Sequence, residues 1–533
     1  MCGIVGYVGR QEALPILIAG LHRLEYRGYD SSGVAVLTRG GLKVHKAAGK
    51  IRQMESTLPR RLKGTLGIAH TRWATHGQPN DVNAHPHLDC SGNLAVVHNG
   101  IIENAAALRA ELEAQGHVFR SDTDTEVLAH LIEAQGGEFD QAVRQALMAI
   151  QGTYGIVVVD ARVPDRLVAA RNGSPVVIGL GEKEMFVASD VAALVRHTEQ
   201  VVYLDDREVA VVDAGGFRTS TLDAQPTSKS TTTVQWGHEA YDRGEHEHYM
   251  LKEILEQPEA CERTLSGRLD GQFSTAHLGG LNLTARDLLD IKRIKILGCG
   301  SAYYSGIGGA HLIEALTRVP ADAEAASEFR YRNPVIEKDC LYIAVSQSGE
   351  TADTLAAVHE VRRKGGRVLG VVNAVGSSIA RECDGGVYIH AGPEISVAST
   401  KSFTCTLVAF ALLAVHLGRI RDLSPAAGRR LIEALHKLPD QMREILHNPE
   451  PVRAVARKYA GSLNAFFIGR AGGYPVALEG AQKLKEIAYV HAEAYPASEL
   501  KHGPLALICP ETPTFVVLPR DHLYEKSLSS LEE

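Results

Sequence analysis

The sequence lacks the features that mark secreted, membrane-spanning and nucleic-acid-binding proteins. Its start, MCGIVGYVG, has neither the basic segment nor the cleavage site of a signal peptide. No apolar run approaches the ~20 residues that a membrane-spanning helix needs. No long basic run occurs, and the net charge is −7. We therefore expect a cytoplasmic protein, with no nucleic-acid and no membrane partner.

Cysteine pairs at disulfide or metal-ligand spacing are also missing. The eight cysteines are scattered and form no C-x-x-C pair, which is typical of reduced thiols. His85 and His87 form a pair without further ligands, and His238, His246 and His248 lie in a polar stretch without fixed helix or hairpin spacing. We therefore expect no metal and no cofactor.

The chain is too long for one hydrophobic core, and 533 residues predict about three or four domains. Residues 1–220 contain many short β-rich runs, with helical stretches near 101–116 and 124–149. This pattern predicts an α+β domain of stacked sheets with helices outside. The polar residues 221–248 predict a linker, and a helix is expected to begin at Tyr249.

The second half alternates strand and helix, as a doubly wound parallel sheet does. RIKILGCG, a helix, CLYIAVS and a second helix follow one another in the predicted domain 249–425. From about residue 463 the same strand, glycine turn and helix recur in the predicted domain 426–533. This second α/β domain stops before its later strands, so we expect it to be incomplete and the chain to be truncated.

Cys2 is a candidate nucleophile because removal of Met1 would make it the N-terminal residue. Its α-amino group would then have a pKa of ~7.7–8.0, and could accept the thiol proton directly or through a water. Such a pair suits attack on a carboxamide. A cysteine at position two by chance is the alternative, and Cys2 alone does not exclude it.

Further motifs accompany Cys2: LEYRGYDSSG, HTRWATHGQPN, NAHPH, HNGIIEN and SDTDTE. Together with MCGIVGYVG they resemble the N-terminal-nucleophile glutamine amidotransferase domain. The specific resemblance, over essentially the whole chain, is to the glucosamine-6-phosphate synthase family, also called glutamine–fructose-6-phosphate aminotransferases. It implies that glutamine and fructose 6-phosphate are the substrates, that the product belongs to hexosamine biosynthesis, and that the protein is a homodimer.

The resemblance also implies roles for individual residues of the glutaminase half. Arg72 would bind the α-carboxylate of glutamine and Asp124 its α-ammonium. Asn99 and the N–H of Gly100 would form the oxyanion hole. The resemblance assigns Thr75 and His76 to the substrate pocket, and Trp73 to a gate on the ammonia channel. The alternatives are a core aromatic for Trp73, a surface ion pair for Arg72, and a helix N-cap for Asp124.

A phosphate-binding loop is predicted where SQSGETADT follows a strand and opens a helix. Free backbone N–H groups at a helix start attract anions, and the hydroxyls of Ser346, Ser348 and Thr351 and the amide of Gln347 add donors. Gly349 lets the backbone approach closely. An ordinary capping box is the alternative. The duplicated sheet favours phosphate, and the pattern resembles the sugar isomerase (SIS) domain, present twice in this family.

Other sugar contacts are implied by the resemblance alone. Val397 and Ser399, in EISVASTKSF, would touch the sugar. Ser301 stands where the family usually has threonine, and Ala302 stands where it usually has serine, so one hydroxyl contact is missing from the pattern.

ALEGAQKLKEIAYVHAEAYPASELKHGP carries the expected isomerase residues. Glu479, Lys483 and Glu486 share one helix face at i+4 and i+3 spacing, as a surface ion-pair ladder also would. The resemblance makes Glu486 the base that moves a proton between C1 and C2, Lys483 its neighbour at the substrate, and His502 the residue that opens the sugar ring. A plain loop residue is the alternative for His502.

The leading hypothesis is conversion of fructose 6-phosphate to glucosamine 6-phosphate with ammonia from glutamine. The family's Schiff-base lysine lies in a tail beyond the second isomerase domain, so a chain ending at Glu533 is expected to keep the glutaminase and lose the synthase step. A regulatory protein that binds sugar phosphate is the alternative from another class. An amidotransferase for a phosphoribosyl acceptor would need a pyrophosphate loop with adjacent acidic residues, which the sequence lacks.

Overall fold

The computed structural model describes residues 2–25, 28–59, 62–73, 77–234 and 237–533. The chain forms two compact units, Met1–Asp242 and Arg243–Glu533, each with its own hydrophobic core. The division falls inside the predicted linker. The finer division of the second unit at residue 425 stays a prediction.

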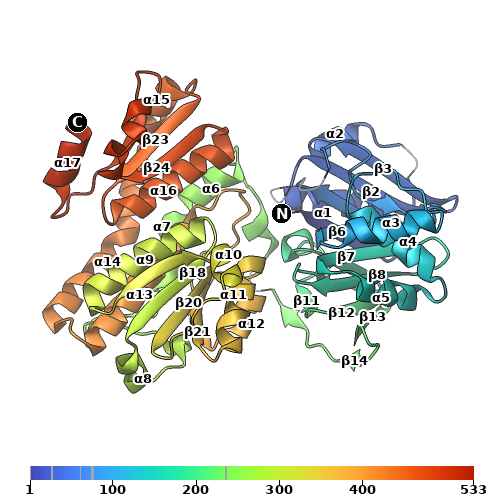
Figure 1. Cartoon of the computed structure of the whole chain (residues 1–533), viewed down its shortest axis with the longest axis horizontal. Helices are drawn as coiled ribbons and strands as arrows, with labels where there is room; N and C mark the ends of the chain where they lie inside the picture. Colours follow the sequence, from blue (N-terminus) through green and yellow to red (C-terminus); the bar gives the residue numbers. More distant parts are fainter. Residues whose placement is uncertain (1, 26–27, 60–61, 74–76, 235–236) are drawn as a thin grey trace. The chain divides into compact units, whose positions relative to one another are not determined.

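The first unit contains two stacked antiparallel sheets with helices on their outer faces (Figure 1). Apolar side chains of both sheets, such as Ile4, Val97 and Val157, fill the space between them. The sheet of eight strands runs, in spatial order, β15 (Thr232–Thr233), β11 (Gln200–Tyr203), β9 (Val177–Leu180), β10 (Met185–Ala188), β1 (Gly3–Val8), β4 (Leu66–Arg72), β2 (Ser31–Thr38) and β3 (Gly41–Ala48). The sheet of seven strands runs β14 (Pro226–Thr227), β13 (Gly216–Thr221), β12 (Glu208–Asp213), β8 (Arg166–Asn172), β7 (Gly152–Asp160), β6 (Leu94–Ile102) and β5 (His87–Leu88).

Among the described residues, five α-helices cover these sheets, because each helix has one apolar face that must be buried. The eight-stranded sheet packs against α1 (Ala13–Leu24) and α2 (Ile51–Ser56). The seven-stranded sheet packs against α3 (Ala105–Ala114), α4 (Thr125–Gln135) and α5 (Phe139–Ala149). The predicted helical stretch 124–149 is therefore two helices, separated where Gly136 and Gly137 adopt positive φ. The predicted α+β class is confirmed.

The first half of the polar segment 221–248, which we expected to be a linker, contains two short strands. Strand β14 pairs with β13, and β15 pairs with β11, so the backbone from residue 226 to residue 233 twice joins a sheet edge. These strands have two residues each and mostly exposed side chains. Backbone hydrogen bonds hold them, and hydrophobic periodicity gives no signal for strands of that kind.

The second unit begins with a five-stranded parallel sheet with helices on both faces (Figure 1). In spatial order its strands are β19 (Ala321–Ala325), β18 (Arg293–Gly298), β20 (Cys340–Ser346), β21 (Arg367–Val372) and β22 (Gly385–Tyr388). One face packs against α7 (Gln257–Leu265), α9 (Ser301–Thr317), α13 (Lys401–Ile420) and α14 (Pro425–His447). The other face packs against α10 (Ala326–Tyr331), α11 (Ala352–Arg363) and α12 (Ser378–Glu382). The remaining elements before α14 are α6 (Tyr249–Leu255), the strands β16 (Leu269–Asp270) and β17 (Thr275–Ala276), the short 3-10 helix η4 (Gly279–Leu281), and α8 (Ala285–Asp290).

The predicted repeat is present in the strand order. A three-stranded parallel sheet of β24 (His491–Pro496), β23 (Asn464–Gly469) and β25 (Thr514–Val517) follows α15 (Glu450–Tyr459). Strand β23 lies between β24 and β25, as β18 lies between β19 and β20. Helix α16 (Gly473–Lys483) follows β23 as α9 follows β18, and α17 (Tyr524–Glu532) follows β25 as α11 follows β20.

Helix α13 is the one described helix that is long and apolar enough to cross a membrane, with a mean hydropathy of 1.8. The sequence reading had found no run of that length. In the structure 61% of its apolar window is buried within the protein, where it packs against α7 and α9. This is the position of a core helix.

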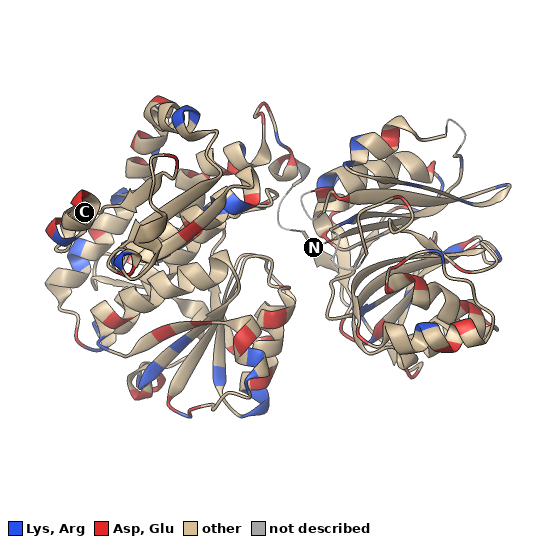
Figure 2. Cartoon of the chain, turned by 45° about the horizontal axis from the view of Figure 1, so that its top comes forward, with Lys and Arg blue, Asp and Glu red and all other residues tan. Residues whose placement is uncertain are grey.

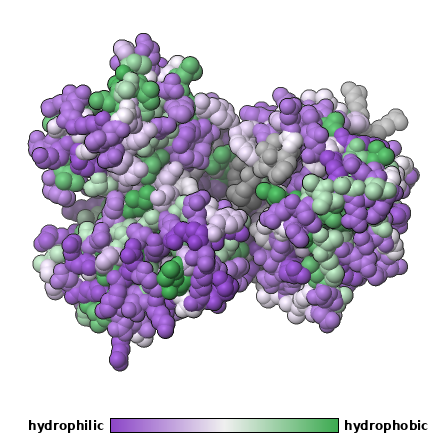
Figure 3. All heavy atoms as spheres, in the orientation of Figure 1, coloured by the Kyte–Doolittle hydropathy of each residue, from purple (hydrophilic) through white to green (hydrophobic). Residues whose placement is uncertain are grey.

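The surface mixes both charge signs. Figure 2 shows Lys and Arg interspersed with Asp and Glu along the helices of both units. Most of the face seen in Figure 3 is hydrophilic, and the hydrophobic residues on it are scattered in small groups. Scattered apolar residues of this kind are ordinary on a folded protein.

Candidate active site

Cys2 lies at the start of the central strand β1, directly beside the end of β4. The register pairs Gly3 with Thr71, which brings Cys2 next to Arg72 and Trp73. The backbone N–H of Trp73 donates to the Sγ of Cys2 at 3.2 Å. Burial raises the pKa of the Cys2 thiol, while the Trp73 N–H and the charge of Arg72 oppose that rise. A thiol of this kind is protonated at neutral pH and needs a base to become a nucleophile.

Asn99 reaches the nucleophile from the other sheet, where it lies on β6. Its Nδ2 donates to the backbone carbonyl of Cys2 at 3.0 Å, and its Oδ1 lies 3.0 Å from Nε2 of His70. These two partners set which end of the amide faces Cys2. Gly100 follows with φ +139°, and a Cβ there would lie 2.1 Å from the carbonyl oxygen of Thr153. Only glycine therefore fits beside Asn99 without moving the backbone.

Four buried histidines lie behind this group, and the sequence reading gave none of them a role. His70 stacks on His85 with ring centroids 4.1 Å apart, and His85 meets His87 edge-on at 4.7 Å. His98 lies 2.8 Å from the Oγ1 of Thr125 through Nδ1. Burial lowers the pKa of His70 to about 3, and lowers the pKa of the other three as well. The rings are therefore neutral at physiological pH and act as hydrogen-bonding packing groups.

Arg72 lies near the thiol, and Asp124 lies close enough to Arg72 for their opposite charges to interact. Arg72 is 4% exposed, which excludes the surface ion pair that the sequence left open. Burial lowers the pKa of Arg72, while Cys2, Asp124 and Asp30 raise it through their charges. Asp124 occupies the N-cap position of α4 but makes no side-chain cap. Its Oδ2 instead accepts from the N–H of Ile102 at 2.8 Å.

Trp73 is not a core aromatic, because 40% of it is exposed. Its ring meets Tyr29 edge-on, with centroids 5.3 Å apart. The backbone below it is tightly packed: a Cβ on Gly28 would lie 2.5 Å from the carbonyl carbon of Arg72 and 2.6 Å from the nitrogen of Trp73. The predicted pocket residues Thr75 and His76 lie outside the described residues.

The predicted phosphate loop lies at the carboxyl end of β20, where parallel sheets bind ligands. The Oγ of Ser346 accepts from the N–H of Gly349 at 3.0 Å and lies 2.9 Å from Oγ1 of Thr351. The Oγ of Ser348 accepts from the N–H of Glu350. Thr351 makes no side-chain cap on α11, so the capping-box alternative does not describe this loop. The backbone carbonyl of Gln347, and not its side chain, accepts from the N–H of Ala374.

Gly349 is the conformational centre of this loop. It has φ +66°, and an added Cβ would lie 1.9 Å from the Oγ of Ser377. That hydroxyl is buried and makes no hydrogen bond within the part of the chain that the structure describes. Because Gly349 has no side chain, the Ser377 hydroxyl can pack directly against the loop.

Val397 and Ser399 belong to a loop that precedes α13. Val397 is 42% exposed, and the Oγ of Ser399 donates to Glu394 at 3.3 Å. The loop is held from beneath by the buried carboxylate of Glu253, which accepts from the N–H of Ser396 at 3.0 Å. Burial and then the charge of Glu394 raise the pKa of Glu253 to about 7.

The predicted isomerase residues meet on α16 and on the π-helical segment Leu484–Ala488 that follows it. Lys483 Nζ lies 3.0 Å from Glu479 and 2.7 Å from Glu486. Ser301 lies on α9, which packs against the five-stranded parallel sheet. Its Oγ donates to Glu479 at 2.8 Å and accepts from Lys483 at 3.3 Å. Glu479 is 7% exposed, so the group is not a surface ladder. Burial raises the pKa of the Glu479 carboxyl.

Neither Ala302, which stands where the family usually has serine, nor the predicted ring-opening residue His502 joins this group. The side chain of Ala302, next to Ser301, packs against the core of the first sheet. His502 is exposed after the short turn Glu499–Lys501, and its imidazole makes no hydrogen bond or ion pair with the described residues. The structure therefore brings Ser301, Lys483 and Glu486 together and does not bring His502 to them.

Comparison with known proteins agrees with both halves. The family model of the glutamine amidotransferase domain matches residues 70–196, and that of the SIS domain matches residues 287–416 and 458–531. Glutamine–fructose-6-phosphate aminotransferase [isomerizing] from Chlorobaculum tepidum is 48% identical, over all of this chain and 88% of that protein. The protein of the same name from Thermus thermophilus is 49% identical over the same shares. The chain belongs to the glutamine–fructose-6-phosphate aminotransferase family.

A solved structure agrees with the second unit of this aminotransferase. The C-terminal domain of glucosamine-fructose-6-phosphate aminotransferase from Francisella tularensis has a TM-score of 0.52 and 37% identity, and covers 55% of this chain and 81% of that one. The predicted family, fold class and enzyme type are thereby confirmed. No comparison tests the roles of single residues, which stay predictions.

Proposed function

We propose that this protein converts glutamine and fructose 6-phosphate to glutamate and glucosamine 6-phosphate. The observation that carries the proposal is the placement of the Cys2 thiol, which accepts the Trp73 N–H and lies beside the amide of Asn99 and the buried Arg72. A nucleophile, an amide donor and a buried cation at one strand end suit hydrolysis of a free amino acid's carboxamide.

The glutaminase step begins when the α-amino group of processed Cys2 takes the thiol proton. The sulfur then attacks the δ-carbonyl carbon of glutamine. Asn99 Nδ2 and the Gly100 N–H would donate to the resulting oxyanion. Collapse of this intermediate breaks the C–N bond, releases ammonia with the returned proton and leaves a thioester. Water then hydrolyses the thioester to glutamate and free Cys2.

Recognition of glutamine would use the charges near the thiol. Arg72 would pair with the α-carboxylate and Asp124 with the α-ammonium, with Thr75 and His76 at the pocket. Opposite charges in these places select a free amino acid over a peptide-bonded glutamine. Trp73 would gate the path of ammonia, which its exposed ring beside the nucleophile supports.

The sugar step would use the second unit. Ser346, Gln347, Ser348 and Thr351 would bind the phosphate at the start of α11, where free N–H groups attract an anion. Ammonia would replace the C2 oxygen of the ketose with loss of water. Glu486 would then move a proton from C1 to C2, with Lys483 beside it.

The other predicted sugar residues complete this proposal. Ser301 would hold the sugar between the two sheets, which its contacts with Glu479 and Lys483 support. Val397 and Ser399 would touch the sugar, and the exposed His502 would open the sugar ring from a neighbouring subunit.

The test is to incubate the full chain with both substrates and to measure glutamate and glucosamine 6-phosphate together. Wild type and a Cys509→Ser variant, which changes an exposed cysteine, should form both products, which would contradict the loss of the synthase step expected for a chain that ends at Glu533. Cys2→Ala should form neither product from glutamine. Glutamate without amino sugar would overturn the synthase step and leave a glutaminase. Absence of both products, with Met1 shown to be removed, would favour a sugar-phosphate-binding regulator.

A cytoplasmic location and a homodimer complete the proposal. All eight cysteines are free, which suits a reducing compartment. Exposed apolar side chains at Tyr489, Leu505 and Leu507, on either side of His502 in the sequence, offer a surface that a second copy could bury. Light scattering at two protein concentrations tests the dimer.

A further inference from the structure

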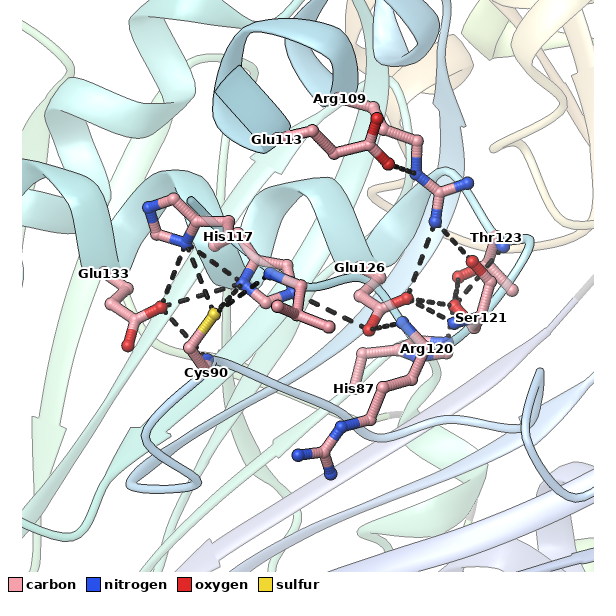
Figure 4. A network of polar contacts seen from close by, with 12 residues as sticks. His87, Cys90, Arg109, Glu113, His117, Arg120, Ser121, Thr123, Glu126 and Glu133 are labelled. Carbon is pink, nitrogen blue, oxygen red and sulfur yellow. Dashed lines mark hydrogen bonds and ion pairs between the residues drawn. The ribbon is translucent and has the colours of Figure 1, made fainter. Parts of the chain in front are cut away.

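Cys90, His117, His130 and Glu133 form a cluster of four metal-ligating side chains in the first unit. One ligand atom from each lies within 4.8 Å of the others. Figure 4 shows Cys90, His117 and Glu133 pointing toward one another, away from the group around Ser121. Cys90 follows β5, His117 follows α3, and His130 and Glu133 share one face of α4 at i+3 spacing. None of these residues belongs to the catalytic group around Cys2.

The distances within the cluster are those of a tetrahedral ligand set. The Sγ of Cys90 lies 3.6 Å from Nδ1 of His117 and 3.4 Å from Nδ1 of His130. The two Nδ1 atoms are 3.3 Å apart, and Oε2 of Glu133 lies 3.2 and 3.6 Å from them. With Zn–N bonds of ~2.0–2.1 Å and Zn–S bonds of ~2.3 Å, tetrahedral corners lie roughly 3.3 Å apart for two nitrogens and roughly 3.6 Å apart for sulfur and nitrogen.

Contacts with groups outside the cluster orient its ligand atoms inward. His130 is 1% exposed, and its other ring nitrogen, Nε2, lies 3.6 Å from Glu126. At this distance no hydrogen bond forms, but the charge of Glu126 favours the tautomer with its proton on Nε2, whose Nδ1 lone pair faces the cluster. Glu133 is held by the backbone N–H groups of Cys90 at 3.0 Å and Ser91 at 3.1 Å. A carboxylate behind a ligating histidine, as Glu126 lies behind His130, is typical of metal sites.

Hydrogen bonds alone cannot account for all the close contacts within this cluster. Five contacts of 3.2–3.6 Å join the sulfur, two nitrogens and one oxygen. With the ring proton of His130 on its Nε2, the thiol and His117 supply at most two protons for these contacts. A cation at the centre would be bound by all four atoms at once. Cys90 is exposed, so an ion can reach the cluster from solvent on that side.

We propose that Cys90, His117, His130 and Glu133 bind a structural Zn²⁺ ion. The mixture of one thiolate, two imidazoles and one carboxylate suits zinc over magnesium or calcium, and four protein ligands leave no open position for catalysis. The ion would tie the segment after β5 and the segment after α3 to α4. Our reading of the sequence expected no metal, because the ligands come from three separate segments.

The experiment uses the full chain, stripped with a chelator and then titrated with Zn²⁺ or with Co²⁺ as a coloured substitute. Wild type should bind about one ion per chain, raise its melting temperature, and show thiolate-to-cobalt charge-transfer absorption. Cys90→Ser and His117→Ala should weaken binding by on the order of 100-fold or more, beyond the ~10–100-fold loss from outer-shell changes. Cys509→Ser is the matched control and should bind like wild type.

Three results would overturn the proposal. The first is no uptake by wild type. The second is uptake that neither Cys90→Ser nor His117→Ala reduces, with both variants folded by circular dichroism. The third is uptake that Cys2→Ala abolishes, because the ion would then sit on the catalytic thiol.

Discussion

Replacing Glu253 with glutamine should stabilise the protein at pH 8 and change it little at pH 5. The Glu253 side chain is 2% exposed and lies near Glu394, so burial and like charge raise its pKa from 4.5 to about 7. Two backbone N–H groups, of Ile395 and Ser396, oppose this rise without cancelling it. A glutamine Oε1 can still accept from both, while it carries no charge.

The size and sign of the effect follow from proton linkage. The folded protein binds the Glu253 proton more tightly than the unfolded chain, so this stabilisation is complete below pH 4.5 and is lost as the pH rises through about 7. The shift from 4.5 to about 7 corresponds to about 3 kcal/mol in the free energy of unfolding at pH 8, and to less than about 1 kcal/mol at pH 5. Glu253→Gln should recover most of the loss at pH 8.

Thermal unfolding of wild type and variant at the two pH values provides the assay. At roughly 2 °C per kcal/mol for a unit of this size, we expect the variant's melting temperature to rise by about 6 °C at pH 8 and by at most about 2 °C at pH 5. Glu444→Gln, which removes an exposed carboxylate of the same unit, is the control and should give no difference. Equal shifts at both pH values, or a variant less stable than wild type at pH 8, would refute the reasoning.

Three further predictions concern the two sites. Gly28→Ala should lower glutaminase kcat/KM at least tenfold, because its Cβ would meet the backbone of Arg72 and Trp73; unchanged activity would show that this backbone can move. Gly349→Ala should raise the KM for fructose 6-phosphate and spare glutamine hydrolysis measured without sugar, because the new Cβ would collide with Ser377. Lys483→Met should abolish amino-sugar formation and lower the melting temperature, because two carboxylates lose their shared cation. Lys483→Arg should restore the melting temperature, and equal stability of the two variants would contradict this account.

Local patterns in the sequence predicted the elements that have strong periodicity. The alternation of strand and helix from residue 290, the repeat at residue 463 and the shared face of Glu479, Lys483 and Glu486 all appear in the structure, because each depends on residues close in the chain. The N-terminal position of Cys2 was informative for a similar reason. A nucleophile that uses its own α-amino group needs no distant partner to be noticed.

Features built from distant residues escaped the sequence reading. The stacked rings of His70 and His85 come from β4 and from the segment before β5, which belong to different sheets, so the packing of the two sheets places them in contact. The cluster around Cys90 has the same origin, since a loop, a helix end and a helix face supply its atoms. Glu253 looked like one polar residue in a short helix, and only the fold shows that it is buried against Glu394.

The pairing of β1 on both sides predicts how glutamine hydrolysis is lost when the protein is heated. Strand β1 is hydrogen-bonded to β4 and β10, so Gly3–Val8, directly after Cys2, lie in the middle of a sheet, where residues so near a chain end seldom lie. Amides in such a strand exchange with solvent only when the whole unit opens. Cys2 is thus attached to the slowest-opening part of its unit. Loss of glutamine hydrolysis on heating should therefore coincide with global unfolding of that unit, and no earlier local fraying should precede it.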